Sequence, residues 1–502
     1  MSSNRNSYGN ILKAIGLFGG TQAFHIIIGM IRTKFVAILL GPIGMGINGL
    51  LISTTSLVNS ITGLGLRTSA VRDIARAYES KNEARISRVT AVMRKLVWLT
   101  GFLGMMIVLV FAKQLSIWTF QSADYTWAFR IVSLMLLFEQ LRTGQNVLMQ
   151  GTFHYKYIAQ ASIWGSLVGL FVSVPLYYFF REKAIAPVIL IVSAISLAFS
   201  WYYSRKVPIQ PTKVTLKDVL SEGRVMIVLG LAVAMSGILR EGKSYITRIF
   251  ISSNGLLADV GMYTAAMTIA TQYINVILNA MSSDYSPRLA AVSDKNEVFI
   301  ETINRQNKLM ITIITPFILA LIVFIRPFVL LLYSKEFLDI TGMIEWIMLG
   351  MFFRTMSWCL SYTLVAKGEA KSFFWNEALS TVYSLALFMV GYKLLHFTGI
   401  GIGYCLSYVI YTLQFYVICR KKYVFRYSSE NIKLLLIQVT FVFLVFFVLK
   451  FLGYSAWRYA FGVVALIVSC IYTYKRMDEM IPIKEVWSNL KNRLHKKKQN
   501  EA

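Results

Sequence analysis

Two cations, Arg32 and Lys34, stand two positions apart inside an otherwise apolar run, "GMIRTKFVAILLGP". The residues on either side, "QAFHIIIGMI" and "FVAILL", are typical of a membrane segment. A cation at mid-bilayer depth costs at least ~2.5 kcal/mol, and such residues usually face a helix-bundle interior or water. The pair therefore predicts an aqueous cavity inside a membrane protein. Snorkelling to the membrane interface is the alternative, and it suits Lys34 only if the helix ends there.

Further charged residues lie at membrane depth, where cations outnumber acids. The cations are Arg32, Lys34, Arg130, Arg142, Arg240, Lys243, Arg248 and Arg354, and the main acids are Glu139, Glu241, Glu345 and Glu377. In "REGKSYITR", Arg240, Lys243 and Arg248 lie along one broad helical stripe. We expect this stripe to face the same cavity, with an ion pair to Glu241 as the alternative.

Arg142 belongs to "FEQLRTGQNVLMQG", where Glu139 precedes it by three residues on one helical face. The two side chains form either part of a ligand site or a self-satisfied pair that holds helices together. The spacing leaves both interpretations open. Three carboxyl groups are candidate carriers of a coupling proton or sodium ion, because burial can bring a carboxyl into the range of proton exchange. They are Glu139, Glu241 and Glu377.

In two predicted membrane segments, asparagines and threonines lie on the same helical face. Asn59 follows Thr55 in one, and Asn275 and Asn279 follow Thr271 in the other. Amides and hydroxyls suit sugar hydroxyls, and they equally suit packing between helices.

The composition indicates the class of protein that must position these residues. The chain has 502 residues, 56% hydrophobic and 15% charged, with a mean hydropathy of +0.58. These values predict an all-α polytopic membrane protein. The net charge of +27 invites a nucleic-acid interpretation. Because the basic residues are scattered over many short loops, we expect no nucleic-acid partner. The histidines and four cysteines lack metal-ligand spacing, so no metal or other cofactor is expected.

The apolar runs predict about fourteen membrane helices, each roughly 20 residues long or more. They cover approximately 11–40, 43–66, 92–112, 126–150, 158–180, 186–203, 224–252, 259–283, 307–333, 343–366, 373–396, 400–419, 432–451 and 458–475. The first is long for one crossing, and we expect it to be tilted or broken near Arg32. About 35 of the 51 Lys and Arg residues fall in cytoplasmic segments if both termini are cytoplasmic.

A weak internal repeat appears at a shift near 216 residues, which places Arg32 on Arg248 and Asn59 on Asn275. It predicts two pseudo-symmetric six-helix bundles around a central cavity, plus two C-terminal helices. The predicted parts are an N-terminal bundle (1–205), a cytoplasmic linker (206–223), a C-terminal bundle (224–420), two additional helices (421–475) and a basic cytoplasmic tail (476–502).

"GILREGKS", residues 237–244, matches the letters of a nucleotide-binding P-loop. A true P-loop joins a buried strand to a helix in a soluble domain. Here both flanks continue an apolar span, so we interpret the match as chance and expect no ATP hydrolysis.

Several segments carry a family resemblance: "RTKFVAILLGPIGMG", "GLGLRTSAVRDIA", "GMYTAAMTIATQYINVILNAMSSDYSPRLA" and "RPFVLLLYSKEF". Over about residues 9–475 the chain resembles the Wzx-type flippases of O-antigen and related surface polysaccharides. These belong to the multidrug/oligosaccharidyl-lipid/polysaccharide exporter superfamily.

The resemblance implies two bundles that move an undecaprenyl-pyrophosphate-linked oligosaccharide from the inner to the outer leaflet of the bacterial inner membrane by alternating access. Arg32 and Lys34 would meet the pyrophosphate or acidic sugars. Membrane lipids, a polysaccharide polymerase and glycosyltransferases are the implied partners. A drug/cation antiporter on the same fold, a lipid II flippase, and a membrane-embedded glycan polymerase or ligase are the alternatives. Polymerases and ligases are expected to have a long external loop, which this sequence lacks on our segmentation.

Overall fold

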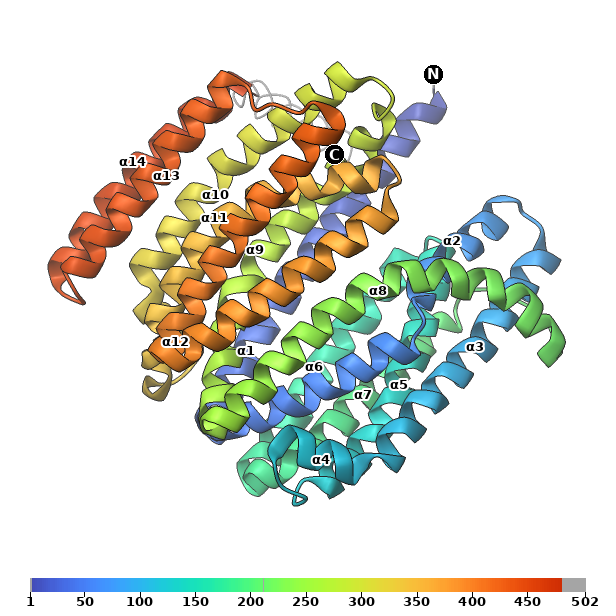
Figure 1. Ribbon diagram of the computed structural model, residues 1–502. Helices are drawn as coiled ribbons and strands as arrows, with labels where there is room; N and C mark the ends of the chain where they lie inside the picture. Colours follow the sequence, from blue (N-terminus) through green and yellow to red (C-terminus); the bar gives the residue numbers. More distant parts are fainter. Residues whose placement is uncertain (1, 211, 481–502) are drawn as a thin grey trace, which may run out of the picture. The chain divides into compact units, whose positions relative to one another are not determined.

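The computed structural model describes residues 2–210 and 212–480, and in these ranges helices are the regular secondary structure (Figure 1). The helices are α1 (Ser2–Thr62), α2 (Leu66–Glu79), α3 (Glu83–Val110), α4 (Ala112–Phe120), α5 (Thr126–Gly151), α6 (Tyr155–Phe180), α7 (Ile185–Ser204), α8 (Leu216–Asn254), α9 (Leu257–Ala291), α10 (Asn296–Leu332), α11 (Thr341–Ala366), α12 (Ala370–Tyr423), α13 (Ser429–Phe451) and α14 (Ala456–Met480). Two short 3₁₀ helices cover Arg181–Ala184 and Lys335–Ile340.

The predicted membrane spans fall on these helices, and the prediction of an all-α polytopic protein is confirmed. By length and composition, seven helical stretches of the described residues can cross a membrane. The most apolar of them, Ser429–Phe451, has a mean hydropathy of 2.7. The chain is therefore a multi-pass membrane protein. The predicted basic tail lies largely outside the described residues.

Two helices each contain two predicted spans, joined at a break. In α1 the break lies at Gly41, whose φ of +61° is open to glycine and costly for other residues, and Pro42 follows it. In α12 it lies at Leu395 and His396. The expected break near Arg32 was wrong in position, since α1 is helical through Arg32 and ends its first half at Gly41.

The chain packs into two compact units, each with its own core. Unit 1 comprises Met1–Ala265 with Leu330–Phe337. Within it α3 and α7 both pack on α5, α6 packs on α7, and α8 packs along α1 (Figure 1). One apolar cluster joins α2, α3, α5 and the start of α8 through Ile74, Met93 and Val219.

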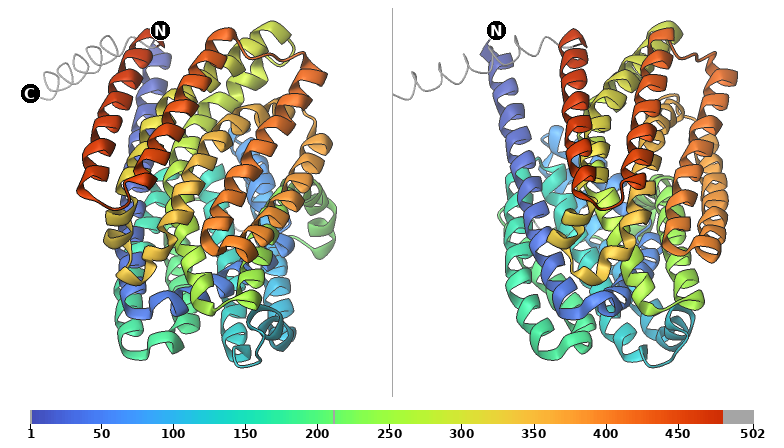
Figure 2. Two further views of the ribbon diagram at one scale, coloured as in Figure 1. Left: turned by 60° about the vertical axis from the view of Figure 1, so that its left-hand side comes forward. Right: turned by 90° about the vertical axis from the view of Figure 1, so that its left-hand side faces the viewer.

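Unit 2 comprises Ala266–Val329 with Leu338–Ala502, and α11 and α12 pack closely in it. Its cluster of buried apolar residues includes Tyr285, Phe299, Leu360 and Phe415. The helices α13 and α14 form an antiparallel pair (Figure 2).

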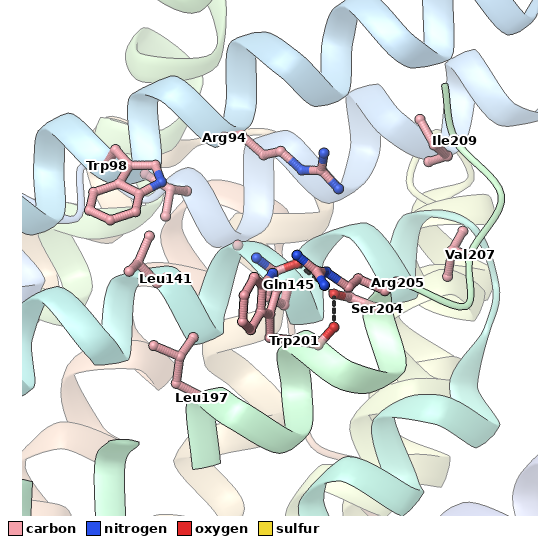
Figure 3. A pocket seen from close by; sticks show the side chains of 12 residues that line it. Arg94, Trp98, Leu141, Gln145, Leu197, Trp201, Ser204, Arg205, Val207 and Ile209 are labelled. Carbon is pink, nitrogen blue, oxygen red and sulfur yellow. Dashed lines mark hydrogen bonds between the residues drawn. The ribbon is translucent and has the colours of Figure 1, made fainter. Parts of the chain in front are cut away.

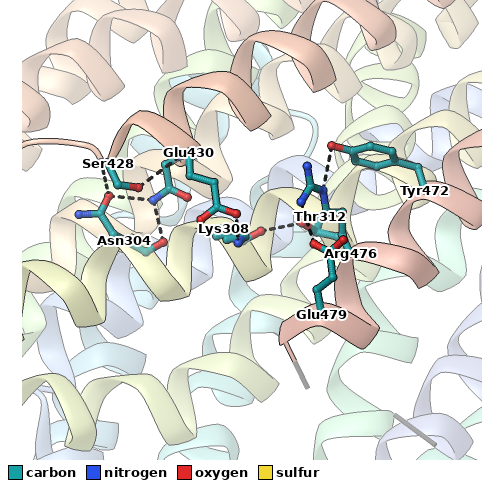
Figure 4. Close-up of polar contacts among 9 residues, drawn as sticks. Asn304, Lys308, Thr312, Ser428, Glu430, Tyr472, Arg476 and Glu479 are labelled. Carbon is teal, nitrogen blue, oxygen red and sulfur yellow. Dashed lines mark hydrogen bonds and ion pairs between the residues drawn. The ribbon is translucent and has the colours of Figure 1, made fainter. Parts of the chain in front are cut away.

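Polar contacts attach this pair to α10 (Figure 4). Asn431 donates to the Asn304 side chain at 2.7 Å, and Lys308 pairs with Glu430. Further along, the Thr473 hydroxyl donates to the Thr312 carbonyl at 3.0 Å. The two final helices are thus fixed to unit 2 by side chains as well as by apolar packing.

The units divide at Ala265, whereas the predicted linker covers 206–223. Helix α8 begins at Leu216, inside the predicted linker, and packs with α1 to α4 inside unit 1. The two compact units are defined by packing, whereas the two predicted six-helix bundles are defined by the internal repeat. The division into two six-helix bundles therefore stays a prediction.

Candidate functional site

Helix α8 carries the densest group of charges predicted to bind substrate, the segment from Arg240 to Arg248, which we call the α8 cationic segment. The helix begins with a capping box in which Thr215 and Asp218 exchange hydrogen bonds. These bonds lower the pKa of the Asp218 carboxyl. From Leu216 to Asn254 the helix is continuous, so "GILREGKS" lies within a helix and follows no strand. The interpretation of the P-loop match as chance is confirmed.

The cations of the α8 cationic segment differ in their surroundings. Arg240 has a side chain that is 77% exposed and meets its neighbour Glu241 at 3.4 Å. Arg248 is held in place, because its guanidinium donates to the Thr264 hydroxyl at 3.3 Å and to the Ser244 carbonyl at 3.2 Å. Its charge also lies 5.5 Å from the centre of the Tyr263 ring. Lys243 is half-buried between them.

On α1, both cations of the opening motif contact other helices of unit 1. The Arg32 guanidinium lies within hydrogen-bonding reach of the Tyr177 hydroxyl on α6. Lys34 donates to the backbone carbonyls of Leu330, at 2.6 Å, and of Tyr333. Because a helix leaves its last four carbonyls without intrahelical partners, Lys34 completes the end of α10. Its half-buried ammonium is therefore at least partly structural.

Asn59 lies on the second half of α1. Its buried side-chain oxygen has no hydrogen-bond partner among the described residues. An amide oxygen in that state is a candidate acceptor for a ligand hydroxyl or for water.

Glu139 and Arg142 form a two-pronged ion pair along α5. One nitrogen of Arg142 donates to a Glu139 oxygen at 2.8 Å, and a second nitrogen donates to the other oxygen. Both side chains are partly buried, with exposures of 32% for Arg142 and 24% for Glu139. Of the two interpretations that the spacing left open, the geometry favours the self-satisfied pair.

Unit 2 holds a separate polar group around Arg354 on α11. Its guanidinium donates to the Asn275 side-chain oxygen on α9 at 2.7 Å, and its charge lies 5.9 Å from the Tyr408 ring centre. On α12 the Tyr411 hydroxyl donates to Glu377. Asn279, one turn beyond Asn275, is exposed.

The predicted residues thus fall into distinct groups. Unit 1 contains Arg32, Lys34, Asn59, Glu139, Arg142 and the α8 cationic segment with Glu241. Unit 2 contains Asn275, Asn279, Arg354 and Glu377. Their assignment to one substrate cavity stays a prediction.

Two features escaped the sequence analysis. The first is a stripe of tyrosines on the second half of α12, Tyr404, Tyr408 and Tyr411, which surrounds Arg354 and Glu377. Their spacing of four and three residues was the available signal. The second is Arg458 on α14, buried and paired with Glu345 at 2.6 Å. Arg458 is the first residue of the last predicted apolar run, and from the sequence a cation in that position is interpreted as an interface residue.

The fold resembles solved transporters. The structure of the lipid II flippase MurJ in an inward closed conformation has a TM-score of 0.70 at 13% identity, covering 92% of this chain and 99% of that one. An inward-facing multidrug resistance MATE family transporter of the MOP superfamily has a TM-score of 0.65 at 14% identity, with coverages of 80% and 94%. A MOP superfamily transporter from Pyrococcus furiosus has a TM-score of 0.59 at 16% identity, with coverages of 82% and 96%.

Sequence comparison gives the family. No curated protein sequence matches this chain. The model of the family described as "Polysaccharide biosynthesis protein" matches residues 35–342, which is more than half of the chain, begins directly after Lys34 and includes the α8 cationic segment. The protein therefore belongs to the polysaccharide biosynthesis protein family and has the fold of the MOP superfamily transporters.

Proposed function

We propose that this protein is a flippase, not an enzyme, which moves a lipid-linked oligosaccharide across the bacterial cytoplasmic membrane by alternating access. The substrate is a repeat unit of O-antigen or a related surface polysaccharide on undecaprenyl pyrophosphate, and it passes from the inner to the outer leaflet. One observation carries the proposal. In a polysaccharide biosynthesis family member, a helix that we predict to span the membrane carries three cations and one acid within the α8 cationic segment.

The chemistry of the substrate matches these residues. A pyrophosphate is a compact anion, which arginine binds in two-pronged fashion and lysine binds as a point charge. Arg240, exposed on α8, and Arg354, set among tyrosines, are suited to the phosphates or to acidic sugars. Asn59 and Asn279 offer amides to sugar hydroxyls. The lipid tail remains in the bilayer while the head group crosses.

A lipid II flippase is the second candidate, and the likeness to the MurJ structure favours it. A drug/cation antiporter fits less well, because cationic drugs need acidic residues and the charges placed at membrane depth are mostly basic. Glycosyltransferases that build the lipid-linked unit and a polymerase that consumes it are the partners we propose. Rescue of a strain depleted of its lipid II flippase would favour the second candidate over the first.

At Arg32, Arg240, Arg248 and Arg354, we expect polysaccharide export to depend more on the positive charge of the side chain than on its shape. Arg→Lys variants should keep partial export, and Arg→Ala variants should lose it while the protein inserts at normal levels. A charge-assisted contact contributes roughly 1.5–3 kcal/mol, so one loss should weaken binding about ten- to a hundredfold. The measurement is complementation of a strain that lacks its surface-polysaccharide flippase, with membrane protein quantified in parallel. Normal export from all four alanine variants would refute the cationic-cavity mechanism.

We further propose coupling to a proton or sodium gradient, with Glu377 as the best of the three candidate carriers. Glu139 is engaged by Arg142, and Glu241 lies beside Arg240, whereas Glu377 accepts from the Tyr411 hydroxyl. Glu377→Gln should abolish the response of export to the gradient at normal abundance. Transport in proteoliposomes with and without an imposed gradient tests this. A Glu377→Gln protein that still responds like the wild type would exclude the residue.

A further inference from the structure

A pocket of about 690 Å³ opens in unit 1 among α3, α5, α7 and the segment that follows α7 (Figure 3). None of the residues discussed for substrate binding lines it. Its walls include Arg94 and Trp98 from α3, Gln145 from α5, Trp201 from α7, and Arg205 directly after α7.

The pocket is positively charged, and the described residues that line it include no acid. The guanidinium groups of Arg94 and Arg205 point into the same space (Figure 3), where their charges repel each other. Within residues 2–210 and 212–480, neither guanidinium has an acidic partner among the ion pairs of the structure. Two like charges held together without a counter-charge favour a bound anion.

The arginines belong to a built site. The guanidinium of Arg205 lies 4.0 Å from the centre of the Trp201 ring, which orients it. Ser204 donates to the Gln145 side-chain oxygen at 2.7 Å, which leaves the amide nitrogen of Gln145 as a further donor. A neighbouring pocket of about 430 Å³ shares Arg94 and adds Lys95 and Lys213.

The rest of the wall is apolar and faces outward. Trp98 is 55% exposed and Trp201 is 51% exposed, and Leu141 and Leu197 also line the pocket. Trp201 lies in the last turn of α7, and an exposed tryptophan at a helix end is typical of the membrane interface. The basic segments at this end, before α3 and after α7, are those that the distribution of Lys and Arg assigns to the cytoplasm.

We propose that this pocket binds the headgroup phosphate of an anionic phospholipid from the cytoplasmic leaflet. Arg94 and Arg205 hold the phosphate from two sides, and an acyl chain runs along Trp98 and Leu197. Basic pockets between helices on the cytoplasmic side suit such headgroups. The site is independent of the proposed transport function, since its ligand is a bulk lipid and its residues lie apart from the α8 cationic segment.

Native mass spectrometry of the purified full-length protein, titrated with phosphatidylglycerol or phosphatidylcholine, tests the proposal. The wild type should retain phosphatidylglycerol in preference to phosphatidylcholine, and the double variant Arg94→Gln, Arg205→Gln should bind it at least tenfold more weakly. The matched control, Arg67→Gln with Arg85→Gln, removes two exposed charges at the same end and should bind like the wild type. Arg94→Lys with Arg205→Lys should keep most of the binding, which separates lost charge from lost folding.

Three results would overturn the proposal. Equal phosphatidylglycerol binding by the wild type and the Gln variant would show that the arginines do not form the site. Equal binding of the two lipids would show that the headgroup charge is not recognised. Displacement of phosphatidylglycerol by millimolar inorganic phosphate would assign the pocket to a free anion.

Discussion

Arg142 and Arg240 both lie on helices that we predict to span the membrane, and their neighbours give them different roles. Glu139 meets Arg142 with both carboxylate oxygens, so that charge is compensated within α5. Arg240 has a side chain that is 77% exposed and only a distant contact with Glu241. Arg142, whose charge is paired on both oxygens of a carboxylate, stabilises the helix bundle. Arg240, whose charge is exposed and predicted to lie at membrane depth, is available to a ligand.

Removal of Arg142 should therefore affect folding before it affects transport. Arg142→Ala leaves the partly buried Glu139 carboxylate without its partner, at a cost of roughly 1–3 kcal/mol, and membrane abundance should fall. The joint change Glu139→Gln with Arg142→Gln should restore abundance and activity, because two amides can hydrogen-bond to each other. Quantified membrane protein and surface polysaccharide provide the measurement. Normal abundance of Arg142→Ala with lost export would instead place Arg142 in the substrate site.

The sequence reveals contacts between residues that are close along one helix. The spacing of Glu139 and Arg142 allowed an ion pair as one of two interpretations, and the pair is present. Lys34 could not be interpreted in this way, because the carbonyls that it meets lie 296 and 299 residues further along the chain. The tyrosines around Arg354 come from another helix, α12, and those near Glu377 come from the other half of its own helix, beyond the break at Leu395 and His396.

At the scale of elements, the "LGPIGMG" motif of α1 has a physical explanation. Gly41 takes the positive φ at the break, and Pro42 begins the next half of the helix. Gly46 faces the start of α9, where a Cβ atom would lie 2.0 Å from the Leu257 carbonyl oxygen. The motif therefore combines a bend with a close helix contact. The predicted spans 11–40 and 43–66 already separate at this glycine, whereas the break expected near Arg32 is absent, because α1 is helical there.

The attachment of α14 to α11 depends on one buried ion pair. Arg458 and Glu345 have side-chain exposures of 2% and 7%, and Arg458 also donates to the Ile322 carbonyl at 3.0 Å. Glu345→Gln should destabilise the protein by ~3–5 kcal/mol, because it leaves a buried guanidinium without its counter-charge. Thermal unfolding in detergent measures the effect.

The exposed pair between Lys308 and Glu430 is the matched control. Glu430 has a side chain that is 59% exposed. Glu430→Gln should therefore cost at most ~1 kcal/mol. Equal losses from Glu345→Gln and Glu430→Gln would contradict the view that burial of the first pair determines its importance.

For the whole molecule, the helical architecture was predictable and its subdivision was not. About fourteen apolar runs indicated the helices, because hydropathy and length decide which segments enter a bilayer. Hydropathy is insensitive to which helix packs on which, so it could not place α8 with α1 inside unit 1. Because hydropathy carries no information on packing, the sequence analysis found the cations of the candidate site but not the side chains that contact them.

The orientation in the membrane remains to be measured. Both termini should be cytoplasmic, because that arrangement places about 35 of the 51 Lys and Arg residues on the cytoplasmic side. Single cysteines at Ser3 and Asn500 should resist membrane-impermeant maleimide in intact cells and react after permeabilisation. Labelling of either end in intact cells would invalidate the model of an even number of crossings.

The buried arginine of α14 has a consequence for biogenesis. Arg458 is the third residue of α14, so its insertion costs less than the ~2.5–3.5 kcal/mol that translocon scales give for arginine at the centre of a membrane helix. Arg458 meets its counter-charge, Glu345, on α11, which is synthesised more than 100 residues earlier. The partner of this arginine is thus already made when α14 is synthesised, and a chain that stops after α12 lacks the counter-charge of the buried Glu345. The final hairpin, although outside the predicted repeat, thus completes a buried ion pair that α11 alone leaves open.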